Sequence, residues 1–421
     1  MNTSSADDPY DVIIIGGGVV GLAVLRAATL KGWRCALVER ESDLLEWASG
    51  SNSGIVCTGV DAAPLERTLI QNSNVRQFCH EMNVPYRDCG SLVCTWPWED
   101  GDLDAVLHES LGAQRLTREE VRQWEPHLSQ QCTGAVHIPG EMVVDPWLFS
   151  IALAVHAKQN GATIFTQFEM DPDTSAQGED GIWTIQRKQT DAASLNPTQL
   201  HARTVVNATG LWTDLVQLAN GTCHWTAQPR RGQYRVYSSP TLVQRPIQPV
   251  PTDRTKGIFV FSTLYDQLVV GPTAVDQESR EDRSVDPSVS AALEQLALRM
   301  VPPLDPLSHV GDYVGLRPGT EHRDYQISVS HNWIACASIR STGLTASLGI
   351  GRYVTQLLEP MLDPPSSIQI QTTPLPSVSQ LVHDYHQRRD GRVEIHGTCY
   401  RVTHPLTRFG WEARTGMAAD S

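Results

Sequence analysis

The most regular pattern of apolar and polar residues lies within the first forty positions of the chain. An apolar run at 11–15 leads into three glycines with the spacing G-x-G-x-x-G, and apolar residues then recur at helical intervals. A second apolar run at 35–39 ends in an acidic residue. This order predicts a strand, a glycine turn, a helix and a second strand. The glycines and the acid are Gly16, Gly18, Gly21 and Glu39.

These four residues have the types and positions that a dinucleotide-binding turn requires. Gly16 allows a tight turn, Gly18 lets a pyrophosphate approach the backbone, and Gly21 lets the helix pack closely against the strand. The helix N-terminus then offers free N–H groups to phosphates. Glu39 lies about twenty residues beyond the glycines, where an acid holds the hydroxyls of a ribose. An ordinary glycine turn would explain the glycines, but not the strand, helix and acid around them.

Predicted strands and helices alternate through most of the remaining chain. Helical periodicity marks 65–83, 146–160, 286–300 and 343–358. A further strand leads into a second glycine turn at 204–210. Other runs of strand length lie at 90–96, 134–144, 163–168, 183–187, 233–237, 258–262, 267–270, 325–330 and 333–337.

This alternation predicts an α/β fold, α+β overall, in which a strand-rich substrate domain interrupts a Rossmann-like dinucleotide-binding domain. The predicted dinucleotide-binding domain comprises 8–64, 145–224 and 308–362. The predicted substrate domain comprises 65–144 and 225–307, and a C-terminal appendage rich in proline and charge follows at 363–421.

Composition and charge narrow the classes of partner. The 421 residues have a net charge of -14 and no basic run, which argues against binding to nucleic acid or to anionic lipid. A small anionic substrate is compatible with this charge, because a few local arginines can outweigh the overall field. The nine cysteines include no CxxC pair, so neither an iron–sulfur cluster nor another metal site is expected.

The N-terminal residues are polar and acidic, and they do not resemble a signal or transit peptide. No apolar run approaches the roughly twenty residues of a transmembrane helix. The sequence therefore predicts a cytoplasmic protein without a transmembrane segment, and peripheral attachment to a membrane stays open.

Seven motifs occur in a characteristic order, and together they resemble the FAD-dependent oxidoreductases of the D-amino-acid-oxidase superfamily. The resemblance covers about residues 10–360, and it is closest to the branch of glycerol-3-phosphate and L-2-hydroxyglutarate dehydrogenases. It implies FAD as the cofactor, a two-domain fold and hydride transfer from a substrate C–H bond to flavin. The motifs are GGGVVG at 16–21, SGSNSGIV at 49–56, VVNATGLWTD at 205–214, RRGQYRVY at 230–237, QLVVGPTA at 267–274, GLRPGT at 315–320 and IRSTGLTAS at 339–347.

The resemblance also implies which residues contact FAD. The segment 49–53 matches a loop along the flavin, and Gly210 matches a motif near the adenine end. The segment 343–345 matches the start of a helix that meets the flavin ring and stabilises negative charge there. The implied contacts are Gly16, Gly18, Gly21, Glu39, Arg40, Ser49, Asn52, Ser53, Gly210, Gly343, Leu344 and Thr345.

Three residues are implied on the substrate side of the flavin. Arg317 matches an arginine that pairs with the anionic group of the substrate, and Arg340 is a weaker match of the same kind. A guanidinium suits this task because it binds carboxylate or phosphate in a bidentate manner. Tyr234 would lie on the floor of the substrate domain. The structural alternatives are surface ion pairs for the arginines and a buried strand position for the tyrosine.

One position departs from the pattern of the branch. The loop commonly carries a histidine after Gly-Ile-Val, and Cys57 stands at that position here. If the histidine is a catalytic base, Cys57 replaces it only if its thiol pKa is depressed. The alternative is a thiol that packs as a small apolar residue.

The resemblance implies an enzyme that oxidises a small anionic alcohol, such as glycerol 3-phosphate or a 2-hydroxy acid. Its electrons would pass to a quinone, a carrier protein or oxygen. Two alternatives stay open. One is oxidation of an amine or amino acid on the same scaffold, and the other is a non-catalytic FAD-binding protein that serves in assembly. The exchange at Cys57 is the feature that favours the non-catalytic alternative.

Overall fold

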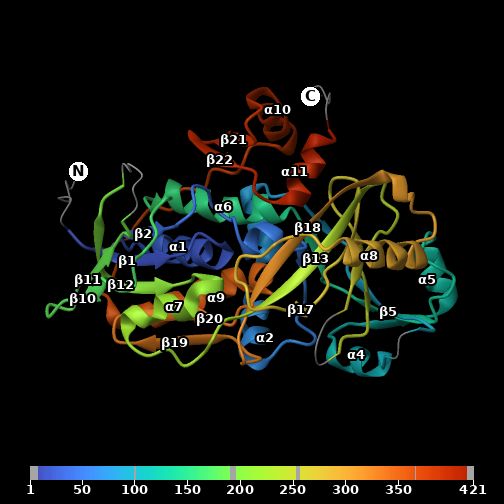
Figure 1. The fold of residues 1–421 in the computed structure, drawn as a ribbon, viewed down its shortest axis with the longest axis horizontal. Coiled ribbons are helices and arrows are strands. Elements are labelled where there is room, and N and C mark those ends of the chain that lie inside the picture. Colours follow the sequence, from blue (N-terminus) through green and yellow to red (C-terminus); the bar gives the residue numbers. More distant parts are fainter. Residues whose placement is uncertain (1–7, 99–100, 190–195, 253–256, 366, 415–421) are drawn as a thin grey trace.

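Two large β-sheets form the body of the protein (Figure 1). The computed structural model describes residues 8–98, 101–189, 196–252, 257–365 and 367–414. Residues 1–7, which carry most of the prediction about a targeting peptide, lie outside these ranges.

The first sheet has eight strands and carries the glycine turn. Its path runs β10-β11-β12-β1-β2-β9, with β20 paired to β12 and β19 paired to β20. Strand β1 is parallel to both β12 and β2, so most of its residues are buried, and its sequence is a continuous apolar run. The strands are β1 (Tyr10–Ile15), β2 (Cys35–Val38), β9 (Thr163–Phe165), β10 (Ala176–Gln177), β11 (Trp183–Gln186), β12 (Gln199–Asn207), β19 (Gln326–Ser330) and β20 (Trp333–Ala337).

Three long helices pack together beside this sheet, and α1 contacts both α6 and α9. The approach of α9 to α1 is close, because a Cβ atom on Gly351 would lie 2.6 Å from the carbonyl oxygen of Ala23. In the described ranges, no helix is both long enough and apolar enough to cross a membrane. The three long helices are α1 (Val19–Lys31), α6 (Pro146–Gln159) and α9 (Gly343–Leu358), and a short helix, α7 (Thr213–Gln217), contacts β12 and β20.

The second sheet has nine strands, in the order β17-β13-β16-β15-β14-β5-β7-β6, with β18 paired to β13. Helix α8 packs on β13 and β16 and shares their apolar core. The strands are β5 (Ser91–Thr95), β6 (Gln114–Leu116), β7 (Gly134–Ile138), β13 (Gln228–Ser238), β14 (Ile247–Pro249), β15 (Phe259–Ser262), β16 (Gln267–Gly271), β17 (Val275–Asp276) and β18 (His309–Gly319). The helices beside it are α4 (Leu103–Glu109), α5 (Arg118–Trp124) and α8 (Pro287–Met300).

The predicted elements and the structure differ in two places. The helical periodicity at 65–83 belongs to two helices, α2 (Pro64–Gln71) and α3 (Val75–Met82), because the polar residues between them end the first helix. The segment 308–362, which we assigned to the dinucleotide-binding domain, begins with β18, and β18 pairs along its length with β13 of the second sheet. The division into two domains itself stays a prediction.

A small third sheet joins β3 (Ile55–Val56), β8 (Met142–Val144) and β4 (Tyr86–Asp88).

The C-terminal appendage folds back onto the body of the protein. Figure 1 shows α10, β21, β22 and α11 together at one edge of the molecule, next to α6. The side chain of Trp411 is fully buried and packs edge-on against Trp147 of α6 and Tyr385 of α10, with ring centroids 5.7 Å apart in both pairs. The appendage therefore shares the main core. Its elements are α10 (Val378–Arg388), β21 (Arg392–Ile395), β22 (Thr398–Arg401) and α11 (Pro405–Glu412).

We expect Trp411→Ala to destabilise the whole protein and not only its last helix. Removing a buried tryptophan side chain costs about 3–5 kcal/mol, and Trp411 contacts α6 as well as the appendage. The measurement is the midpoint of chemical or thermal unfolding. Leu307→Ala is the control, because Leu307 is 92% exposed and its loss should change stability by less than about 0.5 kcal/mol. Equal midpoints for both variants would contradict the expectation.

Candidate active site

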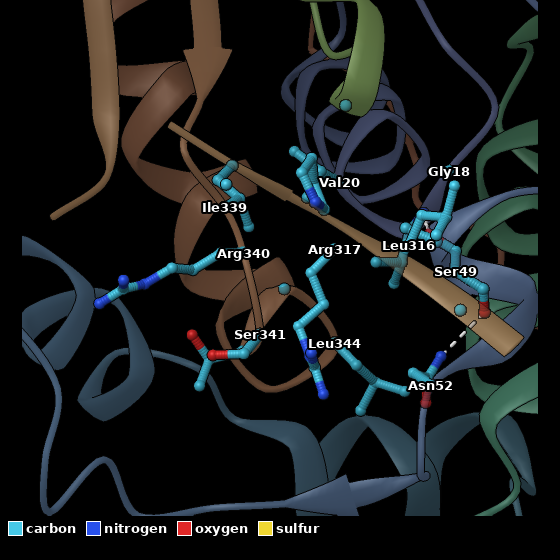
Figure 2. A pocket seen from close by; sticks show the side chains of 18 of the residues that line it. Gly18, Val20, Ser49, Asn52, Leu316, Arg317, Ile339, Arg340, Ser341 and Leu344 are labelled. Atoms are coloured by element: carbon cyan, nitrogen blue, oxygen red, sulfur yellow. Dashed lines mark hydrogen bonds between the residues drawn. The ribbon is translucent and has the colours of Figure 1, made fainter. Parts of the chain in front are cut away.

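A cavity of about 530 Å³ is lined by residues from both large sheets. The glycine turn, the segment after β2 and the start of α9 contribute one part of its wall, and β13 and β18 contribute the other. Figure 2 shows part of this cavity, in which the side chain of Arg317 extends toward Ser341 and Leu344, with Gly18, Ser49 and Asn52 farther to the right. Of the predicted site residues, all except Gly21 line it.

The glycine turn has the geometry that its sequence predicts. Gly16 has a φ of +111°, and a Cβ atom there would lie 2.6 Å from the carbonyl oxygen of Ala208. A Cβ atom on Gly21 would lie 2.0 Å from the carbonyl oxygen of Gly16, so Gly21 serves close packing rather than lining the cavity. A Cβ atom on Gly18 would meet only the hydroxyl of Ser49, at 3.1 Å. The space over Gly18 is therefore open to a ligand at the N-terminus of α1.

Two residues at the end of β2 line the same end of the cavity. One carboxylate oxygen of Glu39 accepts a hydrogen bond from the N–H of Gly17 at 2.6 Å, and burial raises the pKa of this carboxyl. The guanidinium of Arg40 lies 3.7 Å from the ring centroid of Trp212 and 4.8 Å from that of Trp47. Within the described residues, its buried Nη2 atom has no hydrogen-bond partner. This N–H donor is thus left for a ligand in the cavity.

The segment after the turn forms a wall of small polar residues. A 3₁₀ turn at Ala48–Ser51 is followed by Asn52, whose side-chain amide donates to the carbonyl of Ser49 at 2.8 Å and whose amide oxygen accepts from the N–H of Gly54 at 2.8 Å (Figure 2). The hydroxyl of Ser49 accepts from the N–H of Val19 at 2.9 Å. These bonds fix the wall close to the start of α1.

The N-terminus of α9 meets the cavity without a side-chain cap. The hydroxyl of Thr342, its N-cap residue, donates instead to the buried carboxylate of Glu66, and Tyr325 bonds to the same hydroxyl. The positive end of this helix is therefore available to negative charge in the cavity. Glu66 and Thr342 line the cavity, yet sequence reasoning missed both, because Glu66 has only the pattern of a residue in the first turn of α2.

Arg317 is the clearest candidate for contact with a substrate. It lies in β18 opposite Arg230, and its Nη2 atom donates to the carbonyl of Thr273 at 2.9 Å. Gly232 makes room for it, since a Cβ atom there would lie 2.8 Å from that same Nη2. In the part of the chain that the structure describes, no carboxylate forms an ion pair with Arg317. Burial lowers the pKa of its guanidinium, as expected for a cation held away from water.

The other predicted residues of the substrate side have different surroundings. Tyr234 is buried and stacks on Tyr313, with ring centroids 4.5 Å apart. Burial raises the pKa of Tyr234 to about 12, and the positive charge of Arg317 opposes this shift. Arg340 lines the cavity but points away from Arg317 (Figure 2). The half-buried Cys57 donates its backbone N–H to the hydroxyl of Thr345 at 3.3 Å, and its sulfur lies 3.8 Å from the same hydroxyl.

The residues present fit an adenine dinucleotide that carries a flavin. The open face at Gly18 suits a pyrophosphate, a carboxylate such as that of Glu39 suits ribose hydroxyls, and the uncapped start of α9 suits a ring that takes up negative charge. Flavin chemistry also needs no metal ligands from the protein.

The comparison with known proteins agrees with this geometry. Residues 11–357 match the model of the family described as FAD dependent oxidoreductase (DAO). A glycerol 3-phosphate dehydrogenase from Caloramator mitchellensis is 29% identical over 83% of this chain and 74% of that protein. The mitochondrial L-2-hydroxyglutarate dehydrogenase of Homo sapiens is 26% identical over 66% of this chain and 64% of that protein.

A solved structure shares the fold. The dithionite-reduced L-alpha-glycerophosphate oxidase from Mycoplasma pneumoniae, with FAD bound, superimposes with a TM-score of 0.77 over 88% of this chain and 100% of that chain, at 24% identity. The match to the family model extends over most of the chain, and the glycine turn, Glu39 and the uncapped α9 fit the cofactor that the family uses. This chain therefore belongs to the DAO family of FAD-dependent oxidoreductases, and FAD is its cofactor.

Proposed function

We propose that this oxidoreductase is a dehydrogenase or oxidase of a small anionic alcohol, with glycerol 3-phosphate or a 2-hydroxy acid as the substrate class. The observation that carries the proposal is Arg317. Its guanidinium faces the cavity, donates to one carbonyl, and has no carboxylate partner among the described residues. The carboxylate of Asp276, which pairs with Arg230, is near enough to attract this cation but forms no ion pair with it. A shielded cation without a directly bound opposite charge is costly unless a ligand supplies that charge.

The surroundings of Arg317 favour a small anion. The protein as a whole carries a net charge of -14, so an anionic ligand must be drawn in by local groups rather than by the overall field. The relatives described above are named for glycerol 3-phosphate and L-2-hydroxyglutarate, and both compounds are anionic alcohols. A carboxylate and a phosphate each present a pair of oxygen atoms that a guanidinium binds in a bidentate manner.

We assign the roles in the reaction as follows. When bound, FAD would supply the acceptor for the hydride and the proton that the substrate CH–OH group loses as it becomes a carbonyl group. Arg317 binds the anionic group and so fixes the position of that carbon. Tyr234 keeps its proton at neutral pH, since the ordinary phenol pKa is already about 10 and burial raises that of Tyr234 to about 12, so it can donate a hydrogen bond to the substrate. The start of α9 stabilises the negative charge that hydride transfer brings into the cavity.

The remaining assignments concern the cofactor and Arg340. Gly21 keeps α1 close to β1, and Arg340 is a second, weaker anion contact that we place at the rim. The other residues that we assign to FAD are Gly16, Gly18, Glu39, Arg40, Ser49, Asn52, Ser53, Gly210, Gly343, Leu344 and Thr345.

An anaerobic bleaching screen tests the proposed substrate class. The yellow holoenzyme is mixed with glycerol 3-phosphate, with 2-hydroxy acids, with amino acids and with amines, and loss of flavin absorbance is followed. Bleaching by an anionic alcohol supports the proposal. Bleaching by amines or amino acids alone, or by no compound, would replace it with one of the two alternatives. Reoxidation by oxygen, by a quinone or by a carrier protein then identifies the class of electron acceptor.

We expect Arg317→Ala to weaken use of the best substrate by about 30- to several-thousand-fold, because loss of one partner from a shielded ion pair costs about 2–5 kcal/mol. Arg317→Lys should rescue only part of this loss, since it keeps the charge but not the planar fork. The measurement is the rate of anaerobic flavin reduction at sub-saturating substrate. Arg76→Ala is the control, because Arg76 forms an exposed pair with Asp88. Wild-type rates in Arg317→Ala would rule out Arg317 as the anion contact.

Gly18→Val should yield colourless protein, since its side chain would occupy the open space over the start of α1. The measurement is the ratio of FAD absorbance to protein absorbance after purification. Gly134→Ala should stay yellow, because an added methyl group there makes only ordinary contacts, 3.5 Å from a methyl carbon of Leu103. If Gly18→Val retains one FAD per chain, the pyrophosphate assignment is wrong.

Cys57→Ser should keep most of the rate of flavin reduction. A serine hydroxyl is close in size to the thiol and can keep the contact with Thr345, so a packing role would survive the exchange. Cys399→Ser, at an exposed cysteine, is the control. A loss of several orders of magnitude in Cys57→Ser, with FAD still bound, would show that the thiol takes part in the chemistry.

A further inference from the structure

The segment 43–54, which we call the cofactor loop, lies between the cavity and the C-terminal appendage. Its inner side lines the cavity from Leu45 to Ser53. Its outer side bonds to the hairpin of the appendage and to the residues just after it. We propose that the appendage holds the cofactor loop in its binding conformation and thereby retains FAD, so that the appendage is a positioning element for the cofactor.

The hydrogen bonds that the cofactor loop makes within itself lie between Trp47 and Gly54, so they do not fix its first part. Its only regular element is the 3₁₀ turn at Ala48–Ser51. Leu45 has a φ of +64°, a left-handed conformation that is unfavourable for a side chain with a Cβ atom. Residues in such conformations persist only where the surrounding structure imposes them. The loop therefore depends on contacts from other segments.

Three polar contacts from the appendage reach the loop near Leu45. Arg392 donates to the carboxylate of Asp43 at 2.8 Å, and Asp43 is only 6% exposed. Arg401 pairs with Glu46 at 3.3 Å, and the hydroxyl of Thr403 donates to the carbonyl of Leu44 at 3.4 Å. These contacts are on both sides of the strained residue in the sequence.

The opposite part of the loop is held by β18. The hydroxyl of Tyr313 donates to the carbonyl of Asn52 at 3.2 Å. The approach of β18 is close, since a Cβ atom on Gly315 would lie 2.7 Å from the hydroxyl oxygen of Ser51. His404 of the appendage packs against the ring of Tyr313, with centroids 6.1 Å apart. The appendage thus supports the loop directly at its start and supports, through Tyr313, the strand that holds its end.

The appendage is itself attached firmly enough to act as a support. The hydroxyl of Thr407 donates to the buried carboxylate of Asp145 at 2.9 Å, and Tyr265, in the turn between β15 and β16, bonds to the same carboxylate. The indole N–H of Trp147 donates to the carbonyl of Arg401 at 3.0 Å. The hairpin that holds the loop is therefore fixed to α6, next to the cofactor side of the fold.

The consequence is a difference in FAD binding. A loop that is already ordered pays no ordering entropy when FAD binds, whereas a loop that has lost its support must be ordered by FAD itself. The apparent affinity then falls with the fraction of molecules in the binding conformation. The contacts at Asp43 should therefore contribute to FAD affinity although the hairpin that makes them does not line the cavity.

The test measures FAD release from full-length holoenzyme. Wild type and variants are diluted in steps, and the fluorescence of released FAD gives its dissociation constant and its rate of release. Arg392→Gln and Asp43→Asn should each weaken FAD binding by about tenfold or more. The double variant Asp43→Asn/Arg392→Gln should be no weaker than Arg392→Gln alone, because both changes remove one interaction.

Arg388→Gln is the matched control. Arg388 pairs with Asp384 and Glu394 inside the appendage and, among the described residues, forms no hydrogen bond or ion pair with the loop, so FAD binding should change by less than about twofold. Arg401→Gln is a second variant for the case in which Arg392→Gln yields no folded protein. It removes the ion pair between Arg401 and Glu46, which is more exposed than the pair between Arg392 and Asp43, so we expect a smaller loss of FAD affinity. The proposal is overturned if Arg401→Gln and every folded variant of the Asp43–Arg392 pair bind FAD as tightly as wild type. The proposal is also overturned if Arg388→Gln weakens FAD binding as much as the variants of the Asp43–Arg392 pair do.

Discussion

The close packing of backbone at the end of β1 is the constraint on which the rest of the structure depends. The chain must turn at Gly16 beside the carbonyl of Ala208 and then start a helix whose Gly21 touches the carbonyl of Gly16. Neither contact leaves room for a Cβ atom. Only this turn brings the start of α1 to the end of the parallel strands β1, β2 and β12, where ligands bind in open sheets of this kind.

The second sheet adds the chemistry that the first sheet lacks. Strand β18 contacts both the cofactor loop and the substrate side of the cavity. Its Gly315 lies against Ser51 of the cofactor loop, and Arg317, two residues later, reaches the substrate side. The long pairing of β18 with β13 places Arg317 opposite Arg230, and the guanidinium of Arg317 lies over Gly232, where a Cβ atom would collide with it. One strand therefore sets both the fit of the cofactor loop and the place of the anion site.

The parts of the fold and of the cavity that have a local sequence pattern could be predicted from the sequence. The glycine turn, Glu39 and the order of strands and helices follow from periodicity, and the motifs from 16 to 347 indicated the family before the fold was known. Other features depend on contacts between distant segments and carry no local signal. The carboxylate of Glu66 beneath α9 is one example, because its sequence context is that of an ordinary helix start. The structured appendage is another, since its polar composition hides the buried Trp411 and the contacts with the cofactor loop.

The ion pair between Asp43 and Arg392 also affects when the protein can complete its folding during synthesis. The two residues are 349 positions apart, so translation must continue for roughly 17–70 s after Asp43 is made, at 5–20 residues per second, before the pair can form. Strand β1 likewise waits for β12, its parallel neighbour. The segment that holds β1 and Asp43 is thus made well before the partners that complete its contacts, and β1 has no β12 beside it until residues 199–207 have been made.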